Sequence, residues 1–150
     1  MLYLAIKYVH ILLAIIAVGF NASYAAWLVR AQRSPANLEF ALKGVKFLDD
    51  WIANPCYLLL LVSGVAMMVI APWALTTRWL EAAIVLWVVA IAVGYGLYTP
   101  TLRNQIRALA AEGAGGARYQ ALAARGQAVG GILGVVVLVI LALMVFKPAL

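Results

Sequence analysis

The chain has 150 residues, of which 67% are hydrophobic and 11% charged, and its mean hydropathy is +1.04. A soluble domain is nearer half apolar and a quarter charged, so this composition excludes an ordinary soluble domain and predicts an all-α polytopic membrane protein. The formal net charge of +6 would favour nucleic acid as the partner of a soluble chain. Here the basic residues lie between apolar stretches, as membrane topology requires, so we exclude a nucleic-acid partner.

Four apolar stretches are long enough to cross a bilayer, which takes roughly 20 helical residues. They cover residues 2–28, 51–71, 79–99 and 128–146. We therefore expect residues 1–150 to form one domain, a four-transmembrane-helix bundle in a lipid bilayer. The single cysteine, Cys56, excludes an internal disulfide and a site built from cysteines alone.

The first stretch carries polar groups along one helical face. At a spacing of three to four residues, this stripe consists of Tyr3, Lys7, His10, Ala14, Ala17, Asn21 and Tyr24. Ionisable and amide groups in hydrocarbon cost several kcal/mol unless they have partners. The stripe must therefore face other helices or a bound group.

Residues 30–50 connect the first two spans. Ser34 and Pro35 predict a helix start, with proline at the first helical position. An apolar face follows at Leu38, Leu42, Val45 and Leu48. We expect a short amphipathic cytoplasmic helix, either lying at the interface or extending the second span, with a kink or restart at Pro55.

The second span has its own polar stripe at Asp50, Asn54 and Tyr57. In an antiparallel arrangement these residues lie near the depth of Asn21 and Tyr24. Because amides inside a bilayer seek partners, we expect a hydrogen-bonded polar cluster there. The cluster either joins helices or belongs to a proton or solute pathway.

The last two spans carry one acidic residue and a glycine series. Glu81 lies at the depth expected for Lys7, so the two either pair or extend separately to water. A tight loop is expected at 72–78, a helical continuation past Pro100, and a break at 112–116. Gly126, Gly130 and Gly134 have the spacing that allows close helix packing.

The basic residues determine the expected orientation. Residues 30–50 and 101–127 together carry eight basic residues, and the opposite side carries three, Lys7, Arg78 and Lys147. The positive-inside tendency then places both longer loops in the cytoplasm and both termini outside it.

His10 is the only histidine in the chain, and it leaves three roles open. It could be a neutral ring joining helices, a proton-handling group, or the axial ligand of haem b, with Lys7 near a propionate or the iron. A zinc or copper site has less support, because no second histidine and no cysteine or carboxylate lies at ligand spacing.

The order of motifs along the chain resembles a bacterial family of small integral membrane proteins of unknown function. The motifs are Lys7-Tyr8-Val9-His10-Ile11 with Gly19, Asp50-Trp51 with Pro55 and Gly64, Pro100 with Leu102-Arg103, and the closing Met144 to Pro148. More distantly, the first helix resembles HemJ-type protoporphyrinogen oxidases and CopD copper-resistance proteins, through Lys7 and His10. The HemJ resemblance implies bound haem with His10 in the ligand role.

Three classes of function follow from these patterns. The first is a b-type haem protein that handles electrons, gases or peroxides, with His10 as ligand. The second is a carrier or channel for a proton or small solute, using the Lys7, His10, Asn21, Asp50 and Tyr57 stripe. The third is a membrane assembly factor. In each case we expect a homo-oligomer, with a dimer favoured, in the bacterial inner membrane, and no soluble catalytic motif is present.

Overall fold

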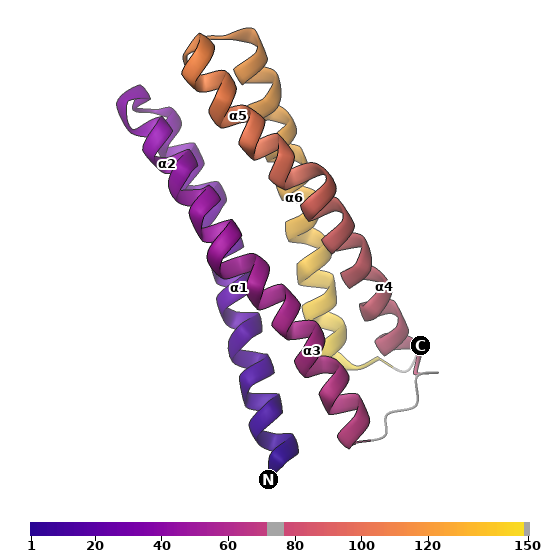
Figure 1. Ribbon diagram of the computed structural model, residues 1–150. Coiled ribbons are helices and arrows are strands. Elements are labelled where there is room, and N and C mark those ends of the chain that lie inside the picture. Colours follow the sequence, from indigo (N-terminus) through magenta and orange to yellow (C-terminus); the bar gives the residue numbers. More distant parts are fainter. Residues whose placement is uncertain (72–76, 149–150) are drawn as a thin grey trace.

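The computed structural model describes residues 1–71 and 77–148, and these residues form helices and two π turns. The elements are α1 (Leu2–Gln32), α2 (Pro35–Leu48), η1 (Asp49–Ala53), α3 (Asn54–Ile70), α4 (Arg78–Val93), η2 (Gly94–Tyr98), α5 (Thr99–Glu112) and α6 (Ala117–Phe146). The π turns η1 and η2 join their neighbours without a break, so four long helical rods result (Figure 1). Each rod is long and apolar enough to cross a membrane, which confirms the predicted all-α, four-span fold. The loop expected at 72–78 falls mostly outside the described residues.

The rods are longer than the bilayer requires. The two central rods have 35 residues each, or about 52 Å of helix, whereas the hydrocarbon core is about 30 Å thick. The first residue of α1 and the last of α6 lie at one end of the bundle, and α2 and α5 lie at the other (Figure 1). We call the second the basic end, because it carries Arg30, Arg33, Lys43, Arg103 and Arg107.

Local sequence signals start and stop the helices at the basic end. Ser34 has extended backbone angles (φ −140°, ψ 95°) and Pro35 occupies the first turn of α2, as predicted. Gly113 has φ +75°, a conformation that glycine adopts without steric penalty, and it ends α5. The break expected at 112–116 is therefore confirmed. The helix expected between the first two spans is α2, and it extends α3.

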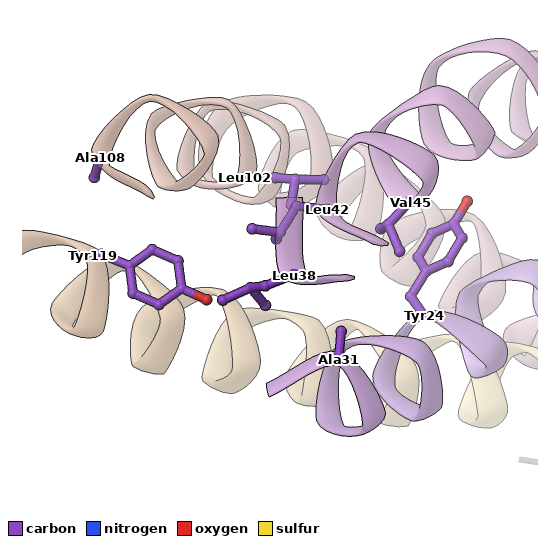
Figure 2. Close-up of a cluster of buried hydrophobic side chains, with 8 residues drawn as sticks. All are labelled: Tyr24, Ala31, Leu38, Leu42, Val45, Leu102, Ala108 and Tyr119. Atoms are coloured by element: carbon purple, nitrogen blue, oxygen red, sulfur yellow. The ribbon is translucent and has the colours of Figure 1, made fainter. Parts of the chain in front are cut away.

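The largest buried apolar cluster lies at the basic end. It combines side chains of α1, α2, α5 and α6, namely Tyr24, Ala31, Leu38, Leu42, Val45, Leu102, Ala108 and Tyr119 (Figure 2). Water drives these apolar faces together, as in a soluble helical bundle. The predicted apolar face of residues 38–48 is confirmed as the part of α2 that fills this cluster.

The spanning halves of the rods are packed more loosely. There α1 packs against α3 and α4 packs against α6, while α3 makes no close backbone approach to α4 or α6 in the described residues. Between none and 11% of the residues in the most apolar window of each rod are buried. Lipid tails are as apolar as leucine side chains, so the hydrophobic effect contributes little to packing the spanning halves of the rods against one another. Specific polar contacts carry more of the helix pairing there.

Each π turn ends two residues before a proline, Pro55 or Pro100. A proline has no N–H group, so it cannot donate to the carbonyl four residues earlier in a regular α-helix. In a π turn each amide instead donates to the carbonyl five residues earlier. The amide of Asn54 donates to the carbonyl of Asp49, and that of Thr99 donates to the carbonyl of Gly94. The kink or restart expected at Pro55 thus takes the form of a π turn within a continuous rod.

Candidate functional site

Three groups of polar contacts follow one another along the packed faces of α1 and α3, and we call them the polar seam. The first group joins His10 to Ser63, the second joins Asn21 to Tyr57, and the third is formed by Asp49, Asn54 and Thr99. The seam runs from the end of the bundle that holds the termini toward the basic end.

The first group holds the His10 ring against α3. His10 Nδ1 lies 2.8 Å from Ser63 Oγ. A Cβ at Gly64 would lie 3.5 Å from His10 Cε1, an ordinary van der Waals distance, so the ring packs next to this glycine of α3. The imidazole therefore fills the space between α1 and α3, and helix joining is one of its roles.

The hydroxyl of Ser63 indicates the tautomer of His10. Ser63 Oγ donates its single hydrogen to the Leu59 carbonyl at 2.7 Å, with Leu60 a second acceptor nearby at 3.2 Å. With this hydrogen on the Leu59 carbonyl, the serine oxygen accepts a hydrogen from His10 Nδ1. In that tautomer the Nε2 atom carries a lone pair, which is the atom that a proton or a metal would bind.

The second group joins Asn21 and Tyr57, two residues of the expected polar cluster. Asn21 Nδ2 donates to the Tyr57 hydroxyl, which joins the middle of α1 to α3. The bond satisfies an amide that would otherwise face lipid.

The third group is built around a buried carboxylate. Asp49 is 5% exposed, and its Oδ2 accepts hydrogen bonds from Thr99 Oγ1 at 3.2 Å and from Asn54 Nδ2 at 3.5 Å. Asp49 forms no ion pair with any described residue. Because a buried charge is costly without a counterion, this carboxylate is the least compensated polar group of the seam. We call Asp49, Asn54, Thr99 and their neighbour Tyr24 the Asp49 centre.

The structure corrects the position of the acidic residue in the cluster. Asp50, predicted to lie with Asn54 and Tyr57, is instead exposed and forms an ion pair with Lys46. A regular α-helix would align Asn54 with the residue four positions earlier, but the π turn aligns it with the residue five positions earlier. That residue is Asp49.

Tyr24, another predicted member of the cluster, borders the Asp49 centre. It is 3% exposed, and its buried hydroxyl has no hydrogen-bond partner among the described residues. Its ring lies against Val45, with the hydroxyl directed away from Leu38 and Leu42 (Figure 2). The electrostatic neighbours of this hydroxyl include Asp49, Tyr98 and Tyr57.

The three glycines of the α6 series have different surroundings in the structure. A Cβ at Gly126 would lie 3.6 Å from Gln105 Oε1, and a Cβ at Gly130 would lie 3.3 Å from Tyr98 Cε2. A Cβ at Gly134 would meet no atom within 4 Å. Gly130 therefore allows a close approach of α6 to η2, and Gly126 lies at ordinary contact distance from α5, while Gly134 meets no neighbour among the described residues.

Lys7 and Glu81 are both exposed and do not form an ion pair with each other. Of the two alternatives, an ion pair or separate extension to water, the structure has each side chain exposed on its own. Among the described residues there is also no group of three or more histidine, cysteine, aspartate or glutamate side chains that could hold a metal ion.

Four residues at or near the polar seam were not predicted from the sequence to belong to a site: Asp49, Ser63, Thr99 and Tyr98. Pro55 and Pro100 were visible signals that the helical register could change ahead of Asn54 and Thr99. Ser63 beside Gly64 was the available signal for a close contact with the lone histidine.

The comparisons with known proteins now decide the family. Residues 4–148 match a family described as "Predicted integral membrane protein (DUF2269)". The chain belongs to this family. The resemblance to integral membrane proteins of unknown function is thereby confirmed, whereas the distant likeness to HemJ and CopD stays a prediction. No curated protein and no solved structure matches the chain.

Proposed function

We propose that this multi-pass membrane protein is a carrier or channel for small cations, with the Asp49 carboxylate as the binding group. The observation that carries the proposal is a carboxylate 5% exposed, held by two neutral donors and without an ion-pair partner among the described residues. Asp49 lies two residues before the expected span 51–71, and an ionisable group buried without a counterion at the edge of a spanning bundle is a candidate for an ion or proton pathway. A bound cation would compensate the negative charge of the Asp49 carboxylate, which has no ion-pair partner among the described residues.

Two further features support a pathway at this place. The seam continues from Asp49 through Tyr57 and Asn21 to His10, so polar groups are available along α1 and α3. The centre joins two rods beside their π turns, because Asp49 is the first residue of η1 and Thr99 directly follows η2. Such turns within helices are frequent at functional sites.

Flux into liposomes tests the proposal. Purified protein is reconstituted with an internal dye for protons, sodium or potassium, and a gradient of that one cation is applied. We expect wild-type protein to dissipate a gradient and Asp49→Asn to lose about tenfold or more of that flux, because an amide cannot compensate the cation's charge. Asp49→Glu, which keeps a carboxylate, should retain part of it.

An exposed acidic residue of α2 supplies the control. Glu39→Gln removes a carboxylate that pairs with Lys43, and it should leave the flux unchanged. Wild-type flux no faster than that of empty liposomes, or a folded Asp49→Asn variant with full flux, would contradict the proposal.

We also propose that the basic end faces the cytoplasm and both termini lie outside it, in a bacterial inner membrane. The eight-to-three distribution of basic residues supports this orientation. A reporter fused at the C-terminus should then be active only as an extracytoplasmic reporter, and one inserted at Gly115 only as a cytoplasmic reporter. The reverse pattern would reject the orientation and reverse the direction of the seam.

Haem binding is a second candidate function, and the His10–Ser63 contact favours it. In the tautomer whose Nδ1 donates to Ser63 Oγ, the Nε2 atom of His10 is the one that would ligate iron, and Ser63 fixes the other ring nitrogen, as in many metal-binding histidines. Lys7, three residues earlier and exposed, could meet a propionate. Bound haem would supply electron transfer or gas binding.

The visible absorption spectrum of the purified protein tests haem binding. Protein made with ample haem should show Soret absorption that His10→Ala abolishes and Lys7→Ala retains. Colourless wild-type protein would reject haem, and a spectrum unaltered in His10→Ala would reject the ligand. If neither cation flux nor haem is found, an assembly role is left, in which the seam only joins helices and a homodimer is still expected.

A further inference from the structure

The two oxygens of the Asp49 carboxylate have different surroundings. Thr99 Oγ1 and Asn54 Nδ2 both donate to Oδ2, and Oδ1 accepts no hydrogen bond from the described residues. One oxygen is therefore held in place, while the other keeps its lone pairs available for a ligand.

The donors around Asp49 suit a proton better than a metal ion. Hard metal cations take six or more oxygen ligands in a cage of carboxylates, carbonyls and waters. Thr99 and Asn54 instead direct hydrogens at the carboxylate, and the described residues contain no cluster of three metal-ligating groups. A proton needs only one lone pair, and Oδ1 offers it.

The charged and titratable groups around Asp49 come from every element packed against it. They are Tyr24 of α1, Lys46 of α2, Tyr57 of α3, Tyr98 of η2 and the adjacent Asp50. Lys46 forms its ion pair with Asp50, so it does not pair with Asp49. The tyrosines are neutral donors and acceptors, which leaves protonation as the way to neutralise the buried carboxylate.

Tyr24 has the only hydroxyl of this group that is fully buried without a hydrogen-bond partner in the described part of the chain. Its oxygen can accept a hydrogen, and its own hydrogen can be passed on. A buried hydroxyl is expected to have a hydrogen-bond partner. Asp49 begins η1, which packs against α1, so its protonated carboxyl can serve as that partner through one bridging water.

From these observations we infer that the cation carried at the Asp49 centre is a proton, bound on Oδ1, and that the Tyr24 hydroxyl is the hydrogen-bond partner of the protonated carboxyl. The inference rests on the proposed function and names its substrate. The step is a proton transfer: the Oδ1–H bond forms as an O–H bond of a hydronium ion breaks, and release to water reverses it. Tyr24 acts here as a positioning residue for the bound proton.

Two buried tyrosines make a matched test. Tyr24→Phe removes one oxygen and keeps the ring packing beside Val45. Tyr119→Phe does the same at the other end of the apolar cluster from Tyr24, where a second buried hydroxyl, which points toward Leu38, has no hydrogen-bond partner among the described residues (Figure 2). In liposomes with a proton dye, we expect about a tenfold loss of proton flux in Tyr24→Phe, the size of one hydrogen bond, and no loss in Tyr119→Phe.

Infrared difference spectra between acidic and neutral pH supply a readout independent of flux. Wild-type protein should show a protonated-carboxyl C=O band that Asp49→Asn removes. Tyr24→Phe should shift this band, because the partner of the protonated carboxyl is lost, and Tyr119→Phe should not.

The outcomes separate the inference from the proposed function. Sodium or potassium flux that depends on Asp49, without proton flux, would overturn the inference and leave the cation carrier standing. No flux of any cation would overturn the carrier, while an Asp49-dependent infrared band would still support the proton site. An unchanged band and unchanged proton flux in Tyr24→Phe would overturn the role of Tyr24.

Discussion

Replacing Leu42 by alanine is expected to destabilise the basic end of the bundle by about 2–5 kcal/mol, the range found for emptied core positions. Leu42 is 0% exposed and is the largest fully buried side chain of the cluster between α1, α2, α5 and α6. The substitution removes packing in the one region where water drives the rods together. We expect a marked fall in the melting temperature, measured by fluorescence-detected size-exclusion chromatography in mild detergent.

Phe40 supplies the control on the same helix. It is 80% exposed, so Phe40→Ala removes a larger side chain without opening a cavity, and its melting temperature should stay near that of wild type. Equal effects of the two substitutions would mean that the cluster does not hold the rods together.

Gly130→Leu is expected to cost about 1–3 kcal/mol, the usual penalty of overpacking. A Cβ at this position would already lie 3.3 Å from Tyr98 Cε2, and three further carbons must displace that ring. Tyr98 ends η2, next to Thr99, which donates to Asp49. The same substitution should therefore also lower any Asp49-dependent flux.

Gly134→Leu is the matched control, one helical turn further along α6. Its Cβ would meet no atom within 4 Å, so the added side chain has room within the chain and the melting temperature should not change. A comparable loss from Gly134→Leu would place a second copy of the chain against this part of α6. An unchanged melting temperature in Gly130→Leu would contradict the close approach of α6 to η2.

The contacts of the Asp49 centre illustrate where sequence periodicity stops being informative. A regular 3.6-residue period places Asp50 below Asn54, and this expectation is wrong because the π turn adds a residue to the helical turn. The partner of Asn21 was among the predicted cluster residues, whereas Ser63 and Thr99 were not. Each of these partners lies on another element, and its identity depends on the exact register of two rods.

Local chemistry of the chain by itself determined the class, the presence of four spans, and the helix boundaries at Ser34 and Gly113. Long apolar runs must be helical in a bilayer, Ser34 with Pro35 starts a helix, and Gly113 ends one. The tertiary structure alone decided that Asp49 rather than Asp50 is buried, that His10 meets Ser63, and that Gly130 but not Gly134 faces a neighbour. The physical reason is that apolar runs and helix caps act within a few residues, whereas a buried polar contact depends on how two distant segments are aligned.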